Sequence, residues 1–138
     1  MTTYDRDTTA PAVILCDYGY FEPNNFQFTR VIRIKILKKS GFSWANRVFP
    51  PAYLFHVKGA TFNLVNGDIV RTDLDSKSIY EETIYGRTKR TRIAMPDVKV
   101  GSVIDLEIYF NDIPIEWRFQ DEIPVKHSEL VIPSNPVV

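Results

Sequence analysis

Apolar and polar residues alternate along much of this chain, and the alternation predicts β-strands. Within 102–111, isoleucine, leucine and phenylalanine occupy the even positions from 104 to 110, while Asp105 and Glu107 lie between them. A period of two places the apolar side chains on one face of a strand and the charged ones on the other. Residues 26–37 follow the same rule except near Arg30-Val31, where the pattern slips and a bend or bulge is predicted.

Other segments carry weaker forms of this signal. The apolar run Ala-Val-Ile-Leu-Cys at 12–16 predicts a buried strand that continues as an extended aromatic stretch. A hairpin is predicted around Asn66-Gly67, with Leu64 opposite Ile69, because a type I′ turn requires positive φ at both central residues. The remaining predictions are strands at 53–58, 87–95, 117–119 and 125–132, a helical turn or loop at 42–49, and a helical turn or edge strand at 79–84.

These segments together predict one all-β domain. About eight or nine short strands without a helix of three turns are typical of a mainly antiparallel β-sandwich or half-open barrel, here with one or two short helical turns. A length of 138 residues fits one domain better than two. We predict a disordered, polar N-terminal segment at 1–10 and a single β domain at 11–138.

Composition excludes several classes of function. Seventeen basic and seventeen acidic side chains cancel, which argues against a nucleic-acid binder. The single cysteine, Cys16, allows neither an internal disulfide nor a thiolate metal cluster. No apolar stretch approaches the ~20 residues of a membrane span. No glycine-rich phosphate loop or metal-ligand spacing occurs, so we expect no cofactor and no metal.

Catalytic groups are also sparse. Cys16 ends an apolar strand, and free cysteine is among the most buried residue types, so we interpret it as a packed core thiol. His56 and His127 lie in extended segments, and their positions in the sequence do not pair either of them with a nucleophile. Asp105 and Glu107 project from one strand face about 6.6 Å apart, a spacing that any acidic strand gives. We expect no catalytic centre, and an enzyme that uses these two carboxylates is the least favoured hypothesis.

The charged strands have a simpler interpretation. Arg33 and Lys35 form a basic face that matches the acidic face of Asp105 and Glu107, which predicts cross-strand pairing. The basic cluster, which lacks interleaved aromatic residues, is interpreted as a solvated edge strand. Its members are Arg87, Lys89, Arg90 and Arg92.

Aromatic residues in loops and at strand ends are the candidates for ligand binding. Most of them are expected to pack in the core or at its rim, but some would form a platform for a sugar or peptide. The candidate binding residues are Trp44, Tyr53, Tyr85 and Trp117, with Phe42 nearby.

The order of segments resembles the domain of unknown function 3857 (DUF3857), which precedes a transglutaminase-like core in bacterial proteins, especially from the Bacteroidetes. The resemblance covers nearly the whole chain. It rests on Ala-Pro-Ala-Val-Ile-Leu-Cys-Asp-Tyr-Gly at 10–19, the basic strand at 33–39, Thr-Phe-Asn-Leu-Val-Asn-Gly at 61–67, Met-Pro-Asp-Val-Lys-Val-Gly-Ser-Val-Ile at 95–104, and the segment 117–129 that opens with Trp-Arg-Phe-Gln-Asp-Glu.

The resemblance implies a location and a partner that the residues alone do not. Such proteins carry a secretory signal, absent from this sequence, which implies a periplasmic or cell-envelope location; the sequence alone leaves a cytoplasmic location open. A transglutaminase-like core would follow as part of the same polypeptide. Cys16 and His127 match the β-domain pattern rather than the Cys-His-Asp triad of that core, so no catalytic role passes to them.

Two functional hypotheses follow. The first is a non-catalytic accessory β domain that positions or recruits substrate for a downstream transglutaminase-like or cysteine protease-like domain. The second is a carbohydrate- or peptide-binding module that uses the loop aromatics.

Overall fold

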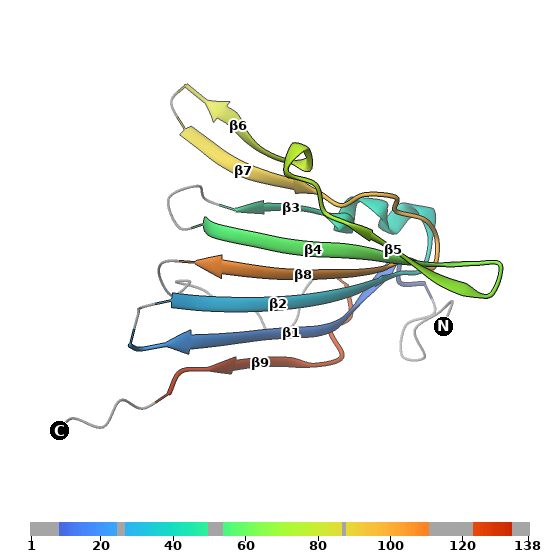
Figure 1. The fold of residues 1–138 in the computed structure, drawn as a ribbon, viewed down its shortest axis with the longest axis horizontal. Helices are drawn as coiled ribbons and strands as arrows, with labels where there is room; N and C mark the ends of the chain where they lie inside the picture. Colours follow the sequence, from blue (N-terminus) through green and yellow to red (C-terminus); the bar gives the residue numbers. More distant parts are fainter. Residues whose placement is uncertain (1–8, 25–26, 50–53, 87, 111–122, 134–138) are drawn as a thin grey trace.

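The computed structural model describes residues 9–24, 27–49, 54–86, 88–110 and 123–133 (Figure 1). The strands are β1 (Ala12–Glu22), β2 (Gln27–Ile36), β3 (Asn46–Phe49), β4 (Leu54–Val65), β5 (Asp68–Asp73), β6 (Ile79–Tyr85), β7 (Thr88–Ala94), β8 (Val103–Phe110) and β9 (Ser128–Val131). Two short 3₁₀ helices are present, η1 (Lys39–Ala45), which overlaps the helical turn or loop predicted at 42–49, and η2 (Ser76–Ser78). The all-β fold class is confirmed.

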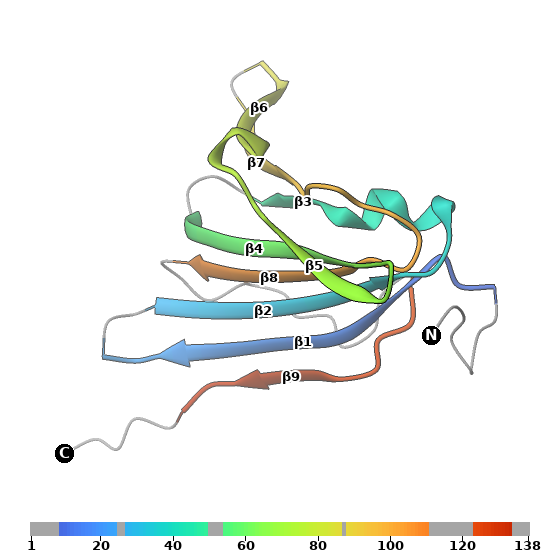
Figure 2. The same ribbon diagram turned by 45° about the vertical axis from the view of Figure 1, so that its right-hand side comes forward.

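The strands form two sheets. The larger has the order β5-β4-β8-β2-β1-β9, in which every pair is antiparallel except β1 with β9. The smaller has the antiparallel order β3-β7-β6. Figures 1 and 2 show the smaller sheet fanned out beyond β4, with η1 leading into β3. No helix among the described residues is long and apolar enough to cross a membrane.

The core lies on one face of the larger sheet, which we call the inner face. Ile14, Ile34 and Ile104 are direct cross-strand neighbours on β1, β2 and β8, and each is at most 2% exposed. Ile93 of the smaller sheet and Met95, directly after β7, belong to the same cluster. Complete burial stabilises the fold by about 1.5–3 kcal/mol for each large aliphatic side chain, so this face carries most of the folding free energy.

The predicted irregularity near Arg30-Val31 is wrong in its position. β2 pairs with β8 in unbroken register through both residues, and the bulge lies in β1 instead, between Ile14 and Cys16. The alternation slips in the sequence because Arg30 takes an inward-facing position, where its guanidinium binds the buried carboxylate of Asp17 at 2.9 and 2.8 Å. An ion pair therefore replaces an apolar contact at this edge of the core.

The bulge also overturns the prediction that Cys16 is a core thiol. One extra residue in β1 reverses the alternation, so Cys16 pairs with Arg33 and lies on the opposite face from Ile14. Its side chain is half-buried rather than buried.

Three other sequence predictions are tested by the strand order. Residues 79–84 lie in strand β6 and not in a helical turn, and 42–49 are divided between η1 and β3. The basic strand is not an edge strand, because β7 lies between β3 and β6. On the face of β7 opposite Ile93, Arg90 and Arg92 both donate hydrogen bonds to Glu82. Ala10 is only 3% exposed and packs with the β domain, whereas 1–8 and 117–119 lie outside the described residues.

Candidate functional site on the outer face of the sheet

The face of the larger sheet opposite the core, which we call the outer face, carries charged side chains in cross-strand rows. One row places Val31, Glu107 and Lys58 side by side on β2, β8 and β4. The next row places Arg33 beside Asp105. Among the described residues no layer of core side chains covers these rows, and such a charged part of a sheet face contacts solvent or a ligand.

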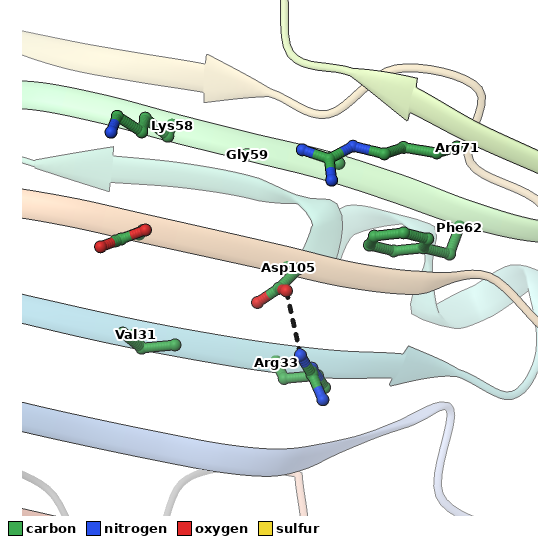
Figure 3. Close-up of a pocket in the computed structure, with 9 residues that line it drawn as sticks. Val31, Arg33, Lys58, Gly59, Phe62, Arg71 and Asp105 are labelled. Carbon is green, nitrogen blue, oxygen red and sulfur yellow. Dashed lines mark hydrogen bonds and ion pairs between the residues drawn. The ribbon is translucent and has the colours of Figure 1, made fainter.

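A hollow of about 210 Å³ lies on this face, and we call it the outer hollow. It exists because Ala60, with only a methyl group, lies between the long side chains of Lys58 and Phe62 on β4. Figure 3 shows the long side chains around this low floor. The lining residues are Val31, Arg33, Lys58, Gly59, Ala60, Phe62, Arg71, Asp105 and Glu107.

Opposite charges border the outer hollow. Asp105 accepts a hydrogen bond from the Arg33 guanidinium at 3.0 Å, which confirms this part of the predicted cross-strand pairing (Figure 3). Lys35 does not complete the pattern, because its ammonium donates to the carbonyl of Gly101 at 2.6 Å. Three cations against two carboxylates give the lining a formal charge of +1, since Lys58 and Arg71 add to Arg33.

One side of the hollow is built around Tyr109. Its hydroxyl donates to the Glu107 carboxylate, and this hydrogen bond raises the pKa of Tyr109 above its ordinary value. The Lys58 ammonium lies 5.8 Å from the centre of the Tyr109 ring. The His56 ring stacks on the Tyr109 ring, with 5.9 Å between the two ring centres. A cation over an aromatic face is held by the ring quadrupole, so Lys58 stays near the rim.

The other side is built around Arg71. Its guanidinium lies 5.6 Å from the centre of the Phe62 ring, and its Nε donates to Asp73 at 2.6 Å. Both partners of this ion pair are well exposed, at 63% and 71%. Exposed pairs contribute at most about 1 kcal/mol, so a ligand carboxylate competes with Asp73 at little cost.

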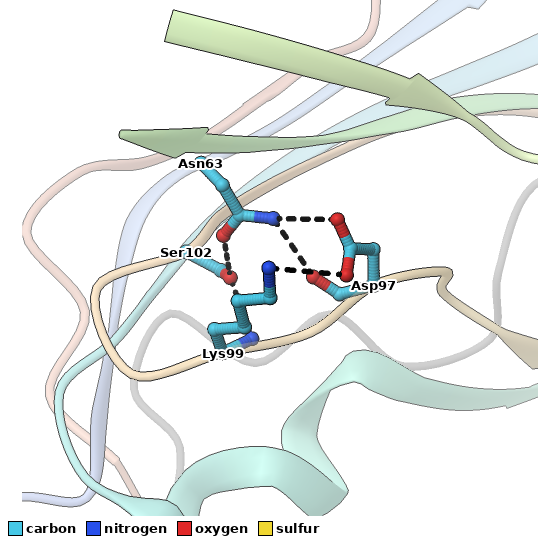
Figure 4. Close-up of polar contacts among 4 residues, drawn as sticks. All are labelled: Asn63, Asp97, Lys99 and Ser102. Carbon is cyan, nitrogen blue, oxygen red and sulfur yellow. Dashed lines mark hydrogen bonds and ion pairs between the residues drawn. The ribbon is translucent and has the colours of Figure 1, made fainter. Parts of the chain in front are cut away.

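A polar cluster positions β4 relative to the loop before β8 (Figure 4). The buried Asn63 amide donates to the carbonyl of Asp97 at 2.8 Å and accepts from the buried Ser102 hydroxyl. The Ser102 hydroxyl accepts from the backbone N–H of Lys99 at 2.7 Å. Each of these hydrogen-bonding groups has a partner within the cluster. The cluster therefore fixes the loop before β8 and is a structural element rather than a binding site.

Cys16 lies on the outer face, and His127 directly precedes the neighbouring strand β9. The carbonyl of His127 accepts from the Asp17 N–H at 2.9 Å, and its ring lies 3.3 Å from the Glu129 carboxylate. No hydrogen bond joins Cys16 to His127 in the described part of the chain. Burial, followed by the negative charge of Asp17, raises the pKa of the Cys16 thiol, the opposite of what a nucleophile requires.

The loop aromatics do not gather at the hollow as far as they are described. Trp44 is half-buried against the core, and Tyr85 lies in β6 with its side chain outside the described residues. Tyr53 and Trp117 also lie outside them, so a platform of these residues stays a prediction. The aromatic residue that lines the hollow is Phe62, which was not among the candidate binding residues. Tyr109 lies beside the lining through its contacts with Glu107 and Lys58, and its odd position in the 102–111 pattern already placed it on the face of Asp105 and Glu107.

The described residues contain no group of three or more His, Cys, Asp or Glu side chains that would hold a metal ion. The two carboxylates of the hollow, Asp105 and Glu107, are bound by Arg33 and Tyr109. The outer hollow can therefore bind a polar ligand through hydrogen bonds and charge, and it brings no activated nucleophile to that ligand.

Comparisons with known proteins show a likeness in fold but no family. A scan against models of protein families and a search of curated proteins find no match. A search of solved structures finds a protein of Parabacteroides distasonis ATCC 8503, named a "putative protease", with a TM-score of 0.55 and 10% sequence identity. The match covers 72% of this chain and 23% of that protein. At this identity the likeness shows the fold alone, and there the fold is a part of a considerably longer polypeptide.

Proposed function

We propose that this chain is a non-catalytic accessory β domain of a longer protein and that its outer hollow recruits a peptide ligand for a hydrolase or transferase domain. The observation that carries the proposal is the outer hollow: a bare sheet face with fixed cations and carboxylates, beside a thiol whose pKa is raised rather than lowered. The occurrence of this fold in less than a quarter of a "putative protease" supports an accessory role. The DUF3857 assignment and an envelope location stay predictions from the resemblance.

The charges of the hollow indicate which ligand fits. A peptide carries carboxylate, ammonium and amide groups together, and the hollow offers Arg71 and Lys58 for the first and Asp105 for the second. Phe62 and Val31 provide apolar contact for the methylene groups between them. Such a site binds through a few placed polar groups rather than through a deep apolar pocket.

Peptide binding and turnover would be measured on the same protein. We expect a library of short charged peptides to bind the wild-type chain and to bind Lys58→Ala more weakly, with Lys77→Ala, an exposed lysine of η2, as the matched control. We expect no hydrolysis of peptide or amide substrates by the chain alone. Turnover that disappears in Cys16→Ala would refute the non-catalytic role, and equal binding by both lysine variants would refute the hollow as the site.

A carbohydrate-binding module is the second candidate, because His56 and Tyr109 stack on the outer face. Sugar rings stack on such aromatic surfaces through their C–H faces. A glycan array would separate the two candidates: a glycan signal lost in Tyr109→Ala and kept in Lys77→Ala favours the sugar. A signal lost only in Trp44→Ala would favour the loop aromatics of the sequence analysis.

A further inference from the structure

The β4–β5 hairpin has an apolar tip that no other part of the described structure covers. Leu64 and Ile69 are 74% and 75% exposed, and Val65 and Val70 are about half as exposed. β4 pairs with β8 only as far as Phe62, so the hairpin extends beyond the sheet, as Figure 1 shows. Four adjacent exposed aliphatic side chains at a loop tip are more than the scattered apolar residues of an ordinary surface.

The outer edge of β5 also has free hydrogen-bonding groups. β5 is an edge strand of the larger sheet and pairs with β4 alone among the described strands. Val65 and Asp68 close the two-residue turn as a hydrogen-bonded pair, and Leu74 N–H donates to Gly59 at 2.8 Å in the same phase. The N–H and C=O groups of the alternate β5 residues therefore point away from β4, and these residues are Ile69, Arg71 and Asp73.

The same three residues set the chemistry of the edge. Their side chains lie on the outer face, because they pair with Leu64, Phe62 and Ala60. Along the edge they present an aliphatic group, a cation and an anion in turn. An antiparallel strand added here would be complementary if it placed an aliphatic residue opposite Ile69, an acidic one opposite Arg71 and a basic one opposite Asp73.

We propose that the β5 edge binds an extended polypeptide by antiparallel strand addition, with the pattern basic, any, acidic, aliphatic, aliphatic. The inference goes beyond the outer hollow, because it names a second surface of the domain and the class of polypeptide that this surface binds. Main-chain hydrogen bonds to Ile69, Arg71 and Asp73 provide affinity, and the side chains opposite them provide selectivity. The second aliphatic residue of the pattern packs on Ile69 and Leu64, and the first on Val70.

A second copy of this chain fits the edge less well. Two β5 strands can form their hydrogen bonds only in certain registers. In these registers, residues whose N–H and C=O groups point away from β4 lie opposite each other. Centring on Arg71 places two guanidinium groups directly opposite each other, and centring on Val70 places each Arg71 opposite an Ile69. Centring on Thr72 pairs each Arg71 with an Asp73, but it places the exposed Ile69 opposite Asp75, beyond the end of β5. Each self-pairing register therefore leaves either like charges or an unmatched Ile69, and complementarity along the whole edge favours a different polypeptide with aliphatic residues opposite Ile69 and Val70.

The test uses the peptide acetyl-Lys-Thr-Glu-Val-Ile-Lys-amide and the complete chain. Amide chemical shifts from ¹⁵N NMR should move for Ile69, Arg71 and Asp73, and fluorescence anisotropy of a labelled peptide should give the affinity. N-methylation of the glutamate or isoleucine blocks a hydrogen bond to the edge and should weaken binding by about tenfold. N-methylation of the valine, whose N–H points away from β5, is the matched control and should change affinity little.

Charge exchange supplies a second arm. Arg71→Glu should weaken binding of this peptide, and a peptide with lysine in place of glutamate should recover it. Equal effects of the two kinds of N-methylation, or no binding of either peptide, would overturn the inference. Weaker binding to Lys58→Ala without an N-methyl pattern would place the peptide in the outer hollow, which overturns strand addition and leaves the proposed function standing. Self-association through β5 in sedimentation would also overturn it.

Discussion

The Asp17–Arg30 ion pair offers the sharpest test of how this fold is held together. Asp17 is 5% exposed and Arg30 22% exposed at the side chain, and two hydrogen bonds of 2.9 and 2.8 Å join them. Both side chains lie on the inner face, beside Ile32 of the core. Asp17→Leu removes the carboxylate and leaves the guanidinium at the edge of an apolar layer.

The expected loss follows from the burial of the pair. Removing one partner of a buried ion pair costs about 3–5 kcal/mol because the other charge is left uncompensated. The partial exposure of Arg30 lets water solvate its charge, so we expect a value near the lower end, about 3 kcal/mol. With a urea m-value of about 2 kcal/mol/M, the unfolding midpoint would fall by about 1.5 M.

Urea unfolding followed by far-UV circular dichroism would measure this loss in Asp17→Leu, Arg30→Met and the double variant. Replacing both partners with apolar groups is often near neutral, so the double variant should be more stable than either single one. The thermodynamic cycle removes the other contacts of each side chain from the comparison. A loss below about 1 kcal/mol in Asp17→Leu, or additive losses in the double variant, would show that the pair is effectively solvated.

Three other predictions concern single groups. Gly41→Ala would place a Cβ 2.2 Å from the carbonyl oxygen of Pro11, so a loss of about 1–3 kcal/mol in urea unfolding is expected, and wild-type stability would contradict this contact. Because the pKa of Cys16 is raised, alkylation by iodoacetamide at pH 7 should be slower than that of glutathione and should accelerate at higher pH; a faster rate would contradict the burial of the thiol. Hydrogen bonds from Arg90 and then Arg92 lower the pKa of Glu82. The stabilisation of the fold by these bonds is present above the ordinary carboxylate pKa and is lost as pH falls through the lowered value. Carboxyl ¹³C titration should show this lowered value and its rise in Arg90→Ala; no rise would contradict it.

Local patterns predicted the parts of the fold that depend on neighbours in sequence. The strand at 102–111 and the turn at Asn66-Gly67, with φ of 51° and 86°, were predicted because alternation and turn chemistry act over a few residues. The pairing of Leu64 with Ile69 followed from the turn. Their exposure did not follow, since it depends on where β8 stops pairing with β4.

The bulge in β1 had no signal in the sequence. The bulge at Leu15 lies in a run of apolar residues that contains no glycine or proline to mark an irregular strand. Such a run fits either face of the sheet. A bulge in such a run changes which residues face the core without changing the local pattern. The bulge explains the error on Cys16, whereas the slip near Arg30 comes from its inward-facing ion pair with Asp17.

The outer hollow could be predicted only in part. The pairing of Arg33 with Asp105 was predicted because the alternation in both strands places charged residues on one face. Lys58 and Arg71 were not assigned to the same site, since their approach depends on the order β5-β4-β8-β2, which non-local pairing sets. A candidate site formed across four strands is visible only once the strand order is known.

Arg71 borders both proposed binding surfaces, so the two are coupled. In the free chain it is one of three cations of the outer hollow, where Asp105 and Glu107 supply two negative charges. A peptide carboxylate bound to Arg71 at the β5 edge neutralises it, and the remaining lining then has equal numbers of positive and negative groups. Strand addition would therefore shift the hollow from a preference for anionic groups to one for neutral or zwitterionic groups. By linkage, an anion held in the hollow by Arg71 would weaken the peptide at the edge to the same extent.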